Sequence, residues 1–151
     1  MTTSPLDERI QSTRQMFARA AVGMAVCAPD GRFLAPNAAY CDMLGYTEAE
    51  LLARTATAVT HPDEQAGHRT MLAEMQSGAR DNSVRDKRYV HKNGDIVFSR
   101  VSVSAWRDAH GALIALMAIA EDVTPRKRAE DFAAQVGLEF GDDSPRVVHD
   151  M

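Results

Sequence analysis

The C-terminal half of the chain contains three strand candidates joined by two short turn sequences, and this pattern constrains the fold more than any other feature. The segments span residues 84–91, 95–107 and 112–123. Residues 92–94 and 108–111 lie between them, and each connection ends in a glycine. Short connections that contain glycine join antiparallel strands as hairpins. We therefore predict three consecutive antiparallel strands.

The middle segment shows which side of this sheet is buried. Its residues alternate between one face with Val97, Val101, Val103 and Ala105 and another with Ser102, Ser104 and Trp106. Alternation with a period of two residues is typical of a strand with one buried face. The valine face is therefore predicted to point into the core.

Two shorter strands are predicted near the N-terminus, at residues 24–28 and 32–35. Between them, Pro29 presets φ, Asp30 can hydrogen-bond locally and Gly31 can take a positive φ. This chemistry predicts a tight turn and a second hairpin.

Helices are predicted between the two groups of strands, over residues 38–44, 47–52 and 62–76. Asn37 can cap the first of them, and Gly45 can end it. Grouped strands with helices between them indicate an α+β fold with an antiparallel sheet. The residues predicted to have structural roles in turns or caps are Asp30, Gly31, Asn37, Gly45, Gly94 and Gly111.

Both ends of the chain are predicted to form helices with apolar stripes. Leu6, Ile10, Thr13, Phe17 and Ala20 are spaced by four and three residues in turn, as in a heptad seam. This seam is expected either to form a dimer contact or to lie on the domain's own sheet. Near the other end, the apolar residues with helical spacing are Ala129, Phe132, Ala133 and Val136.

These patterns divide the chain into four parts. Residues 1–20 are the N-terminal amphipathic helix, 21–124 the central domain, 125–137 a C-terminal helix and 138–151 a tail predicted to be disordered.

Composition excludes several classes of protein. The 151 residues carry a net charge of −4, which leaves no broad basic surface for nucleic acid or anionic lipid. Residues 1–10 contain no apolar run typical of a signal peptide, and the run at 112–120 is too short to cross a bilayer. A cytoplasmic protein is expected, with Cys27 and Cys41 as buried free thiols.

Several short motifs, in order along the chain, resemble those of the PAS domain family. They are Gly23–Val26, Asp30–Leu34, Asn37, Leu44–Tyr46, His61–Asp63, Lys87–Tyr89 with Lys92–Gly94, Asp108 with Gly111, and Asp122–Thr124 followed by residues 126–130. The resemblance covers roughly residues 15–132. No single motif is decisive, but their order and spacing are.

The resemblance implies a five-stranded antiparallel sheet in the order 2-1-5-4-3, with helices over one face. It also implies a sensory role in two-component or cyclic-dinucleotide signalling, upstream of a kinase or a cyclic-dinucleotide enzyme. Such outputs are absent from this sequence, so we expect either a stand-alone module that acts on a partner or a fragment of a longer protein. The sequence contains no phosphate-binding glycine loop, nucleophile elbow or kinase phospho-acceptor motif, so we expect a domain that is not an enzyme.

A ligand, if one binds, is expected between the sheet and the helix at residues 62–76. His68, Met71 and Met75 lie on that helix, and Arg85 lies on the following strand. Methionines give adaptable walls, and His68 or Arg85 could orient a polar or anionic group.

Two cofactors are considered because related sensors bind them. Haem-binding members of the family place a ligating histidine near the position of His68 and an arginine near that of Arg85, so haem stays open as a minor alternative. Flavin photochemistry is not expected, because no cysteine follows Cys41 where light-sensing members carry a reactive one. No metal site is predicted, since His61 and His68 lie two helical turns apart without further ligands.

The signal is expected to leave the domain through Asp122 and Thr124. Their side chains can accept hydrogen bonds from the amides that open the next helix, while Pro125 is expected to disfavour helical geometry at Thr124 and to suit the first turn.

A homodimer is expected through the apolar stripes of the terminal helices, which are too short to be stable alone. The residues predicted to make this contact are Leu6, Ile10, Phe17, Phe132 and Val136. The rival hypothesis is a dimerisation module with a filled core and no ligand.

Overall fold

The computed structural model describes residues 4–137 and contains one five-stranded antiparallel sheet. Its strands are β1 (Gly23–Cys27), β2 (Phe33–Pro36), β3 (Asn82–Val90), β4 (Ile96–Arg107) and β5 (Leu113–Asp122). They are ordered β2-β1-β5-β4-β3, with every neighbouring pair antiparallel. The predicted α+β class, strand number and strand order are confirmed.

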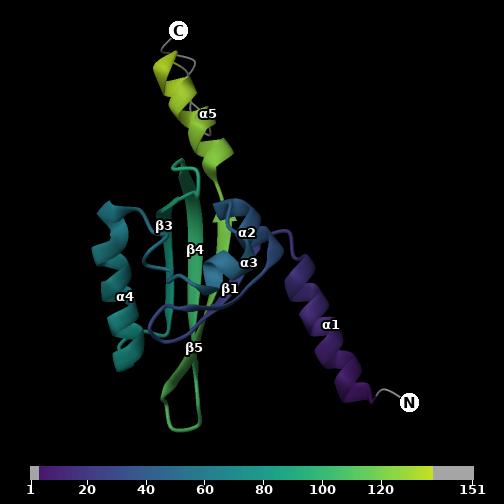
Figure 1. Cartoon of the computed structure of the whole chain (residues 1–151). Coiled ribbons are helices and arrows are strands. Elements are labelled where there is room, and N and C mark those ends of the chain that lie inside the picture. The colour runs from purple at the N-terminus through teal and green to yellow at the C-terminus, as the bar shows by residue number, and fades with distance from the viewer. Residues whose placement is uncertain (1–3, 138–151) are drawn as a thin grey trace, which may run out of the picture.

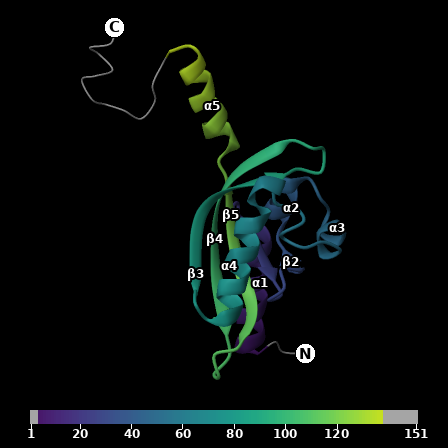
Figure 2. The ribbon, with the colours of Figure 1, turned by 90° about the vertical axis from the view of Figure 1, so that its left-hand side faces the viewer.

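The helices between β2 and β3 lie on one face of the sheet, and two further helices flank the domain (Figures 1 and 2). The covering elements are α2 (Ala38–Leu44), α3 (Glu48–Leu52), the 3₁₀-helix η1 (Pro62–Glu64) and α4 (Gln65–Ser77). The flanking helices are α1 (Pro5–Arg19) and α5 (Thr124–Gln135). Both project away from the sheet, α5 from one end and α1 toward the other (Figure 1).

Burial along β4 follows the predicted alternation, and it adds one polar residue to the inner face. Val97, Val101 and Val103 are buried, whereas Ser104 and Trp106 on the other face are exposed. The buried polar residue on the valine side is Ser99, which is almost inaccessible to solvent. The inner face of this strand therefore has a polar group close to where α5 begins.

The core lies between this inner face and the covering helices. An aromatic group holds its centre: the Tyr40 ring meets both Phe33 and Tyr89 edge to face. The hydroxyls of Tyr40 and Tyr89 lie 3.1 Å apart and share a hydrogen bond. A buried phenol needs such a partner, so this pair satisfies two polar groups with one contact.

Asn37 ties the front of the domain together. Its Oδ1 accepts hydrogen bonds from the backbone N–H groups of Met24 and Tyr40, at 2.9 Å each. Its Nδ2 donates to the carbonyls of Phe17 and Val22. The predicted helix cap is thus also the link between α1, β1 and α2.

The predicted turn residues show the expected local geometry. Asp30 Oδ1 accepts from the Arg32 N–H at 3.1 Å, and Gly31 has a φ of 92°. Gly45 ends α2 with a φ of 78°, and a Cβ there would collide with the ring of His91. The remaining predicted glycines, Gly94 and Gly111, also have positive φ.

The structure corrects two local predictions. The helix expected over residues 62–76 starts as the 3₁₀-helix η1, in which the Glu64 N–H donates to the His61 carbonyl, and the α-helix begins only at Gln65. Cys27 is a buried free thiol as predicted, but Cys41 is only half-buried, at the edge of the core. The tail predicted over 138–151 lies outside the described residues. No helix in the described part of the chain is both long and apolar enough to span a membrane.

Candidate ligand-binding site and signal exit

A small cavity lies between the inner face of the sheet and α4. Its volume is about 20 Å³, which is room for about one water molecule. Most of its wall is apolar, but a histidine, a lysine and two tyrosines reach it. The lining residues are Cys27, Gly31, Tyr40, Ala56, His68, Met71, Leu72, Lys87, Tyr89, Val101, Val103, Leu116 and Ala118.

Lys87 is the most unusual group in this wall. It lies on β3 with only 5% of its surface exposed, and its Nζ is 4.5 Å from the centre of the Tyr89 ring. Within residues 4–137 the amine forms neither a hydrogen bond nor an ion pair with a carboxylate. Burial, together with repulsion from Arg85, lowers the pKa of Lys87 from 10.5 to about 7.

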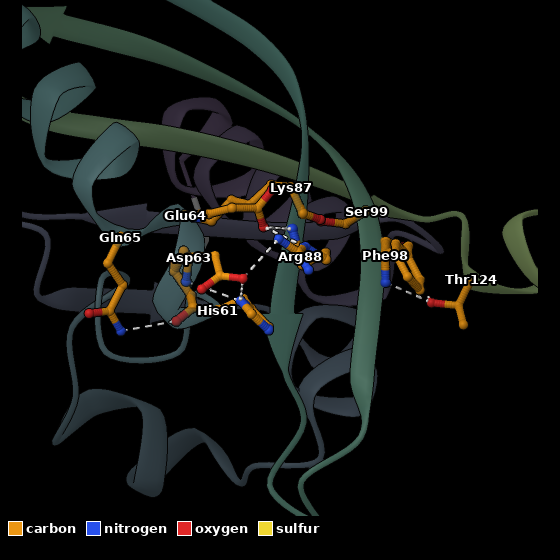
Figure 3. Close-up of polar contacts among 10 residues, drawn as sticks. His61, Asp63, Glu64, Gln65, Lys87, Arg88, Phe98, Ser99 and Thr124 are labelled. Atoms are coloured by element: carbon orange, nitrogen blue, oxygen red, sulfur yellow. Dashed lines mark hydrogen bonds and ion pairs between the residues drawn. The ribbon is translucent and has the colours of Figure 1, made fainter.

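Glu64 is the carboxylate whose charge raises the pKa of Lys87, but it is bonded to a different residue. Glu64 Oε2 accepts a hydrogen bond from the Arg88 backbone N–H at 2.6 Å and lies 3.3 Å from Arg88 Nε (Figure 3). This contact satisfies an N–H on the outer edge of β3, next to the short segment at residues 59–61 that pairs with the same edge. Glu64 is thus engaged on the strand edge and does not neutralise the buried amine.

Arg85 lies two residues before Lys87 and therefore on the same side of β3. Its Nη1 packs against α4, 3.2 Å from where a Cβ at Gly67 would lie. Its Nη2 is buried and has no hydrogen-bond partner among the described residues. Two cationic side chains thus point from one strand toward α4 without a carboxylate between them.

His68 reaches the cavity from α4, as predicted. It is buried, and its Nδ1 lies 2.8 Å from Thr57 Oγ1, so the two share a hydrogen bond. Burial is the largest cause that lowers the pKa of His68 to about 3, with Lys87, Arg85 and Arg69 adding to it. The imidazole is therefore neutral near pH 7.

The surroundings of His68 do not fit a haem. Pockets for ligands of drug size have volumes of roughly 300–1,000 Å³, and the space beside His68 is far smaller. Among residues 4–137, no group of three or more His, Cys, Asp or Glu side chains is placed to hold a metal ion.

The remaining polar groups of the wall favour their neutral forms. Burial is the main cause that raises the pKa of Cys27 to about 12 and that of Tyr89 to about 12. The pKa of Tyr40 is raised well above its usual value for the same reason. Near neutral pH, Lys87 is thus the wall residue whose charge is most sensitive to its surroundings.

The predicted ligand residues fall into three groups. His68 and Met71 line the cavity. Arg85 points to the same side of the sheet but lies beside the cavity, and Met75 is fully buried in the core without lining it. Whether any of them binds a ligand stays a prediction.

Sequence reasoning missed Lys87. The pattern contains a signal for it, because residues 83, 85, 87 and 89 share one side of a strand, and Arg85 among them is predicted to face the ligand site. A lysine at such a position is normally expected to bend its amine toward solvent, so burial of Lys87 is not expected from the sequence.

At the junction between β5 and α5, the side chains of Asp122 and Thr124 form hydrogen bonds with different elements. Asp122 Oδ1 accepts from the Thr124 N–H at 2.9 Å, as expected for a group that organises the start of the helix. Thr124 Oγ1 instead accepts from the Phe98 N–H on β4, also at 2.9 Å (Figure 3). The expected cap by Thr124 is therefore wrong, because its hydroxyl faces the sheet.

The helix also starts earlier than Pro125 suggested. α5 begins at Thr124, and its N-cap is Val123, which has no side-chain cap. The Val123 N–H donates to the Phe98 carbonyl at 2.8 Å, so both backbone groups of Phe98 hold this junction.

A short bonded route connects the cavity to this junction. Ser99 Oγ donates to the carbonyl of Lys87 at 3.0 Å, and Phe98, the preceding residue on β4, holds Thr124 (Figure 3). The wall of the cavity and the first residue of α5 are thus separated by two adjacent residues of one strand.

The terminal helices leave apolar side chains exposed. Leu6 is 64% exposed and Phe132 61%, and Ile10 and Val136 are also exposed. Phe17 is half-buried, near its carbonyl contact with Asn37. The dimer contact expected from these residues stays a prediction.

An antiparallel sheet in the order β2-β1-β5-β4-β3, with helices over one face and a helix leaving from the central strand, is the arrangement of a PAS fold. The chain belongs to the PAS family: the family profile described as the PAS fold matches residues 17–128.

Relatives place this domain in signalling proteins. The chain is 31% identical over 123 residues to the probable diguanylate cyclase DgcE of Escherichia coli strain K12, and 28% identical over 128 residues to the sensor histidine kinase TmoS of Ectopseudomonas mendocina. These matches cover 82% and 84% of this chain, but only 11% and 13% of those proteins. A sensory role in signal transduction follows at the level of the domain.

Solved structures agree on the fold. A domain of a sensory box sensor histidine kinase/response regulator from Geobacter sulfurreducens aligns with a TM-score of 0.65 at 22% identity. The alignment covers 80% of this chain and all of that one.

Proposed function

We propose that this PAS domain binds a small molecule in the cavity between its sheet and α4 and transmits the bound state through α5 to an output protein. The observation that carries the proposal is the position of Lys87. Its side chain lines the cavity, and its carbonyl is bonded to Ser99, one residue from the contact that holds Thr124.

The junction at Thr124 suits a switch. A ligand shifts an equilibrium only when it binds one of two arrangements more tightly. The start of α5 is held by a few hydrogen bonds to Phe98, so a small movement of β3 or β4 can favour or release them. By analogy with the relatives, the output would be a kinase or a cyclic-dinucleotide enzyme, and this domain would have no catalysis of its own.

A tryptophan at Met71 tests the site. Met71→Trp is expected to fill the cavity and remove any bound small molecule, while the fold stays intact by circular dichroism. Native mass spectrometry of the wild type is expected to show an added mass that the variant lacks. The matched control is Met16→Trp on the exposed face of α1, which should keep the ligand. If Met71→Trp binds the ligand with the same affinity as the wild type, the site lies elsewhere.

The relay is tested by hydrogen exchange. In the wild type, ligand is expected to change exchange in residues 126–136. Asp122→Ala combined with Thr124→Ala should abolish that response while the core stays protected. A helix that never responds to ligand in the wild type would show that the junction is a static connection.

The second candidate is a dimerisation module without a ligand. The small volume of the cavity and the exposed apolar residues of α1 and α5 favour it. This function is supported over the first if wild-type protein purified from cells grown in several media is dimeric and carries no added mass.

A further inference from the structure

The proposed function leaves the ligand class open, and the charges in the cavity wall restrict it. Lys87 is nine-tenths buried, lines the cavity and has no anionic partner within the described residues. Buried cationic groups are normally paired, because leaving the charge uncompensated destabilises the fold. A ligand that brings a negative charge would supply the missing partner.

Arg85 supports the same conclusion independently. Its Nη2 is buried without a hydrogen-bond acceptor, and buried donors of this kind are rare in folded proteins. Arg85 and Lys87 also repel one another across one side of β3. An anion close to both would relieve this repulsion and satisfy the open donor.

The nearby acids do not fill this role. Glu64 is held by Arg88 at the strand edge. The other oxygen-bearing side chains that line the cavity are the phenols of Tyr40 and Tyr89, which are bonded to one another.

The rest of the wall suits a short apolar tail. Val101, Val103 and Leu116 form the sheet side, and Met71 and Leu72 form the helix side. A fully polar ion such as phosphate would gain nothing from these surfaces, whereas a short carbon chain would be desolvated by them. Met71 can change rotamer to enlarge the small cavity.

We infer that the cavity binds a small monocarboxylate, whose carboxylate pairs with the amine of Lys87 near the Arg85 guanidinium and whose tail packs on the aliphatic wall. This inference rests on the proposed function and names its ligand class.

Binding is expected to depend on pH in a way that identifies Lys87. The charged or titratable groups that face the amine from the elements around it are Arg85, Tyr89, Cys27, Tyr40, His68 and Glu64. The pKa of His68 is about 3 and that of Cys27 about 12, so neither changes charge between pH 6 and 8. Lys87, with a pKa of about 7, does. Because the carboxylate binds the ammonium form, its affinity is expected to be about tenfold higher at pH 6 than at pH 8.

The experiment is a titration of the whole ¹⁵N-labelled chain with acetate, propionate and pyruvate, followed by NMR shifts of the cavity residues. Propionamide is the neutral analogue, and phosphate is the fully polar anion. Expected results are saturable shifts with the carboxylates, weaker or no shifts with the other two, and the tenfold pH dependence. Lys87→Met should weaken carboxylate binding by roughly 10- to 100-fold, as expected for a lost charged hydrogen bond.

Lys92→Met is the matched control, because this lysine lies on the exposed β3–β4 turn and pairs with Glu50. It should bind like the wild type. If propionamide binds as well as propionate, or if Lys87→Met binds carboxylates normally, the ligand class is overturned while the cavity remains a binding site. If none of the probes shifts the cavity residues at either pH, the carboxylate inference is overturned, and the mass measurement on Met71→Trp decides the proposed function separately.

Discussion

Replacing Lys87 by methionine is expected to stabilise the protein, because methionine keeps the apolar stem and removes the buried charge. The pKa of Lys87 falls from 10.5 in the unfolded chain to about 7 in the fold. At about 1.4 kcal/mol per pKa unit, the folded protein loses at most about 5 kcal/mol by holding this amine in its charged form. Below pH 7 the amine is protonated in both the folded and the unfolded chain, so the destabilisation has its full value there and does not change with pH.

The sign of the pH dependence follows from proton binding. Between pH 7 and 10.5 the unfolded chain binds more protons than the folded one, so the wild type gains stability as the pH rises. Methionine does not titrate. The free energy of unfolding of the wild type, relative to Lys87→Met, should therefore rise by about 2.5 kcal/mol between pH 6 and pH 9.

Urea unfolding followed by far-ultraviolet circular dichroism measures this difference. Both proteins are studied at the two pH values in buffers free of small carboxylates, so that no ligand changes the result. Lys92→Met is the control, and its pH profile should parallel that of the wild type. A difference between wild type and Lys87→Met that stays constant within about 0.5 kcal/mol from pH 6 to pH 9 would refute the assigned burial and charge of Lys87.

Three further predictions concern the frame around the site. Asn37→Ala removes four hydrogen bonds to backbone groups and should lower the free energy of unfolding by roughly 2–4 kcal/mol in urea unfolding; a loss below about 0.5 kcal/mol would contradict its linking role. Thr124→Val keeps the shape but loses the contact with β4, so exchange in α5 should become faster while stability falls by about 1 kcal/mol; unchanged exchange would argue against it. Leu6→Glu with Ile10→Glu should convert a dimer to a monomer in light scattering at high micromolar concentration, and a wild type that is already monomeric there would remove the dimer prediction.

Local patterns in the sequence determined much of the fold. Residues 95–107 alternate with the period of a strand, and the turns on either side of them have the glycines that hairpins need. Asn37 could be recognised as a helix cap because a cap is a contact between near neighbours. The strand order came from the resemblance to the PAS family, since long-range pairing leaves no local trace.

The candidate site depended on tertiary structure instead. His68 and Met71 were predictable from helical spacing, but Thr124 turned its hydroxyl to a strand 26 residues earlier in the chain, which no local rule indicates. The charge of the cavity wall also depends on contacts between residues that are distant in the sequence. Glu64 lies 24 residues before Arg88, and its carboxylate bonds to Arg88 and not to the amine of Lys87. A lysine on a strand can reach water or point into the core, and only the packing of η1, α4 and β3 around it determines which of the two occurs.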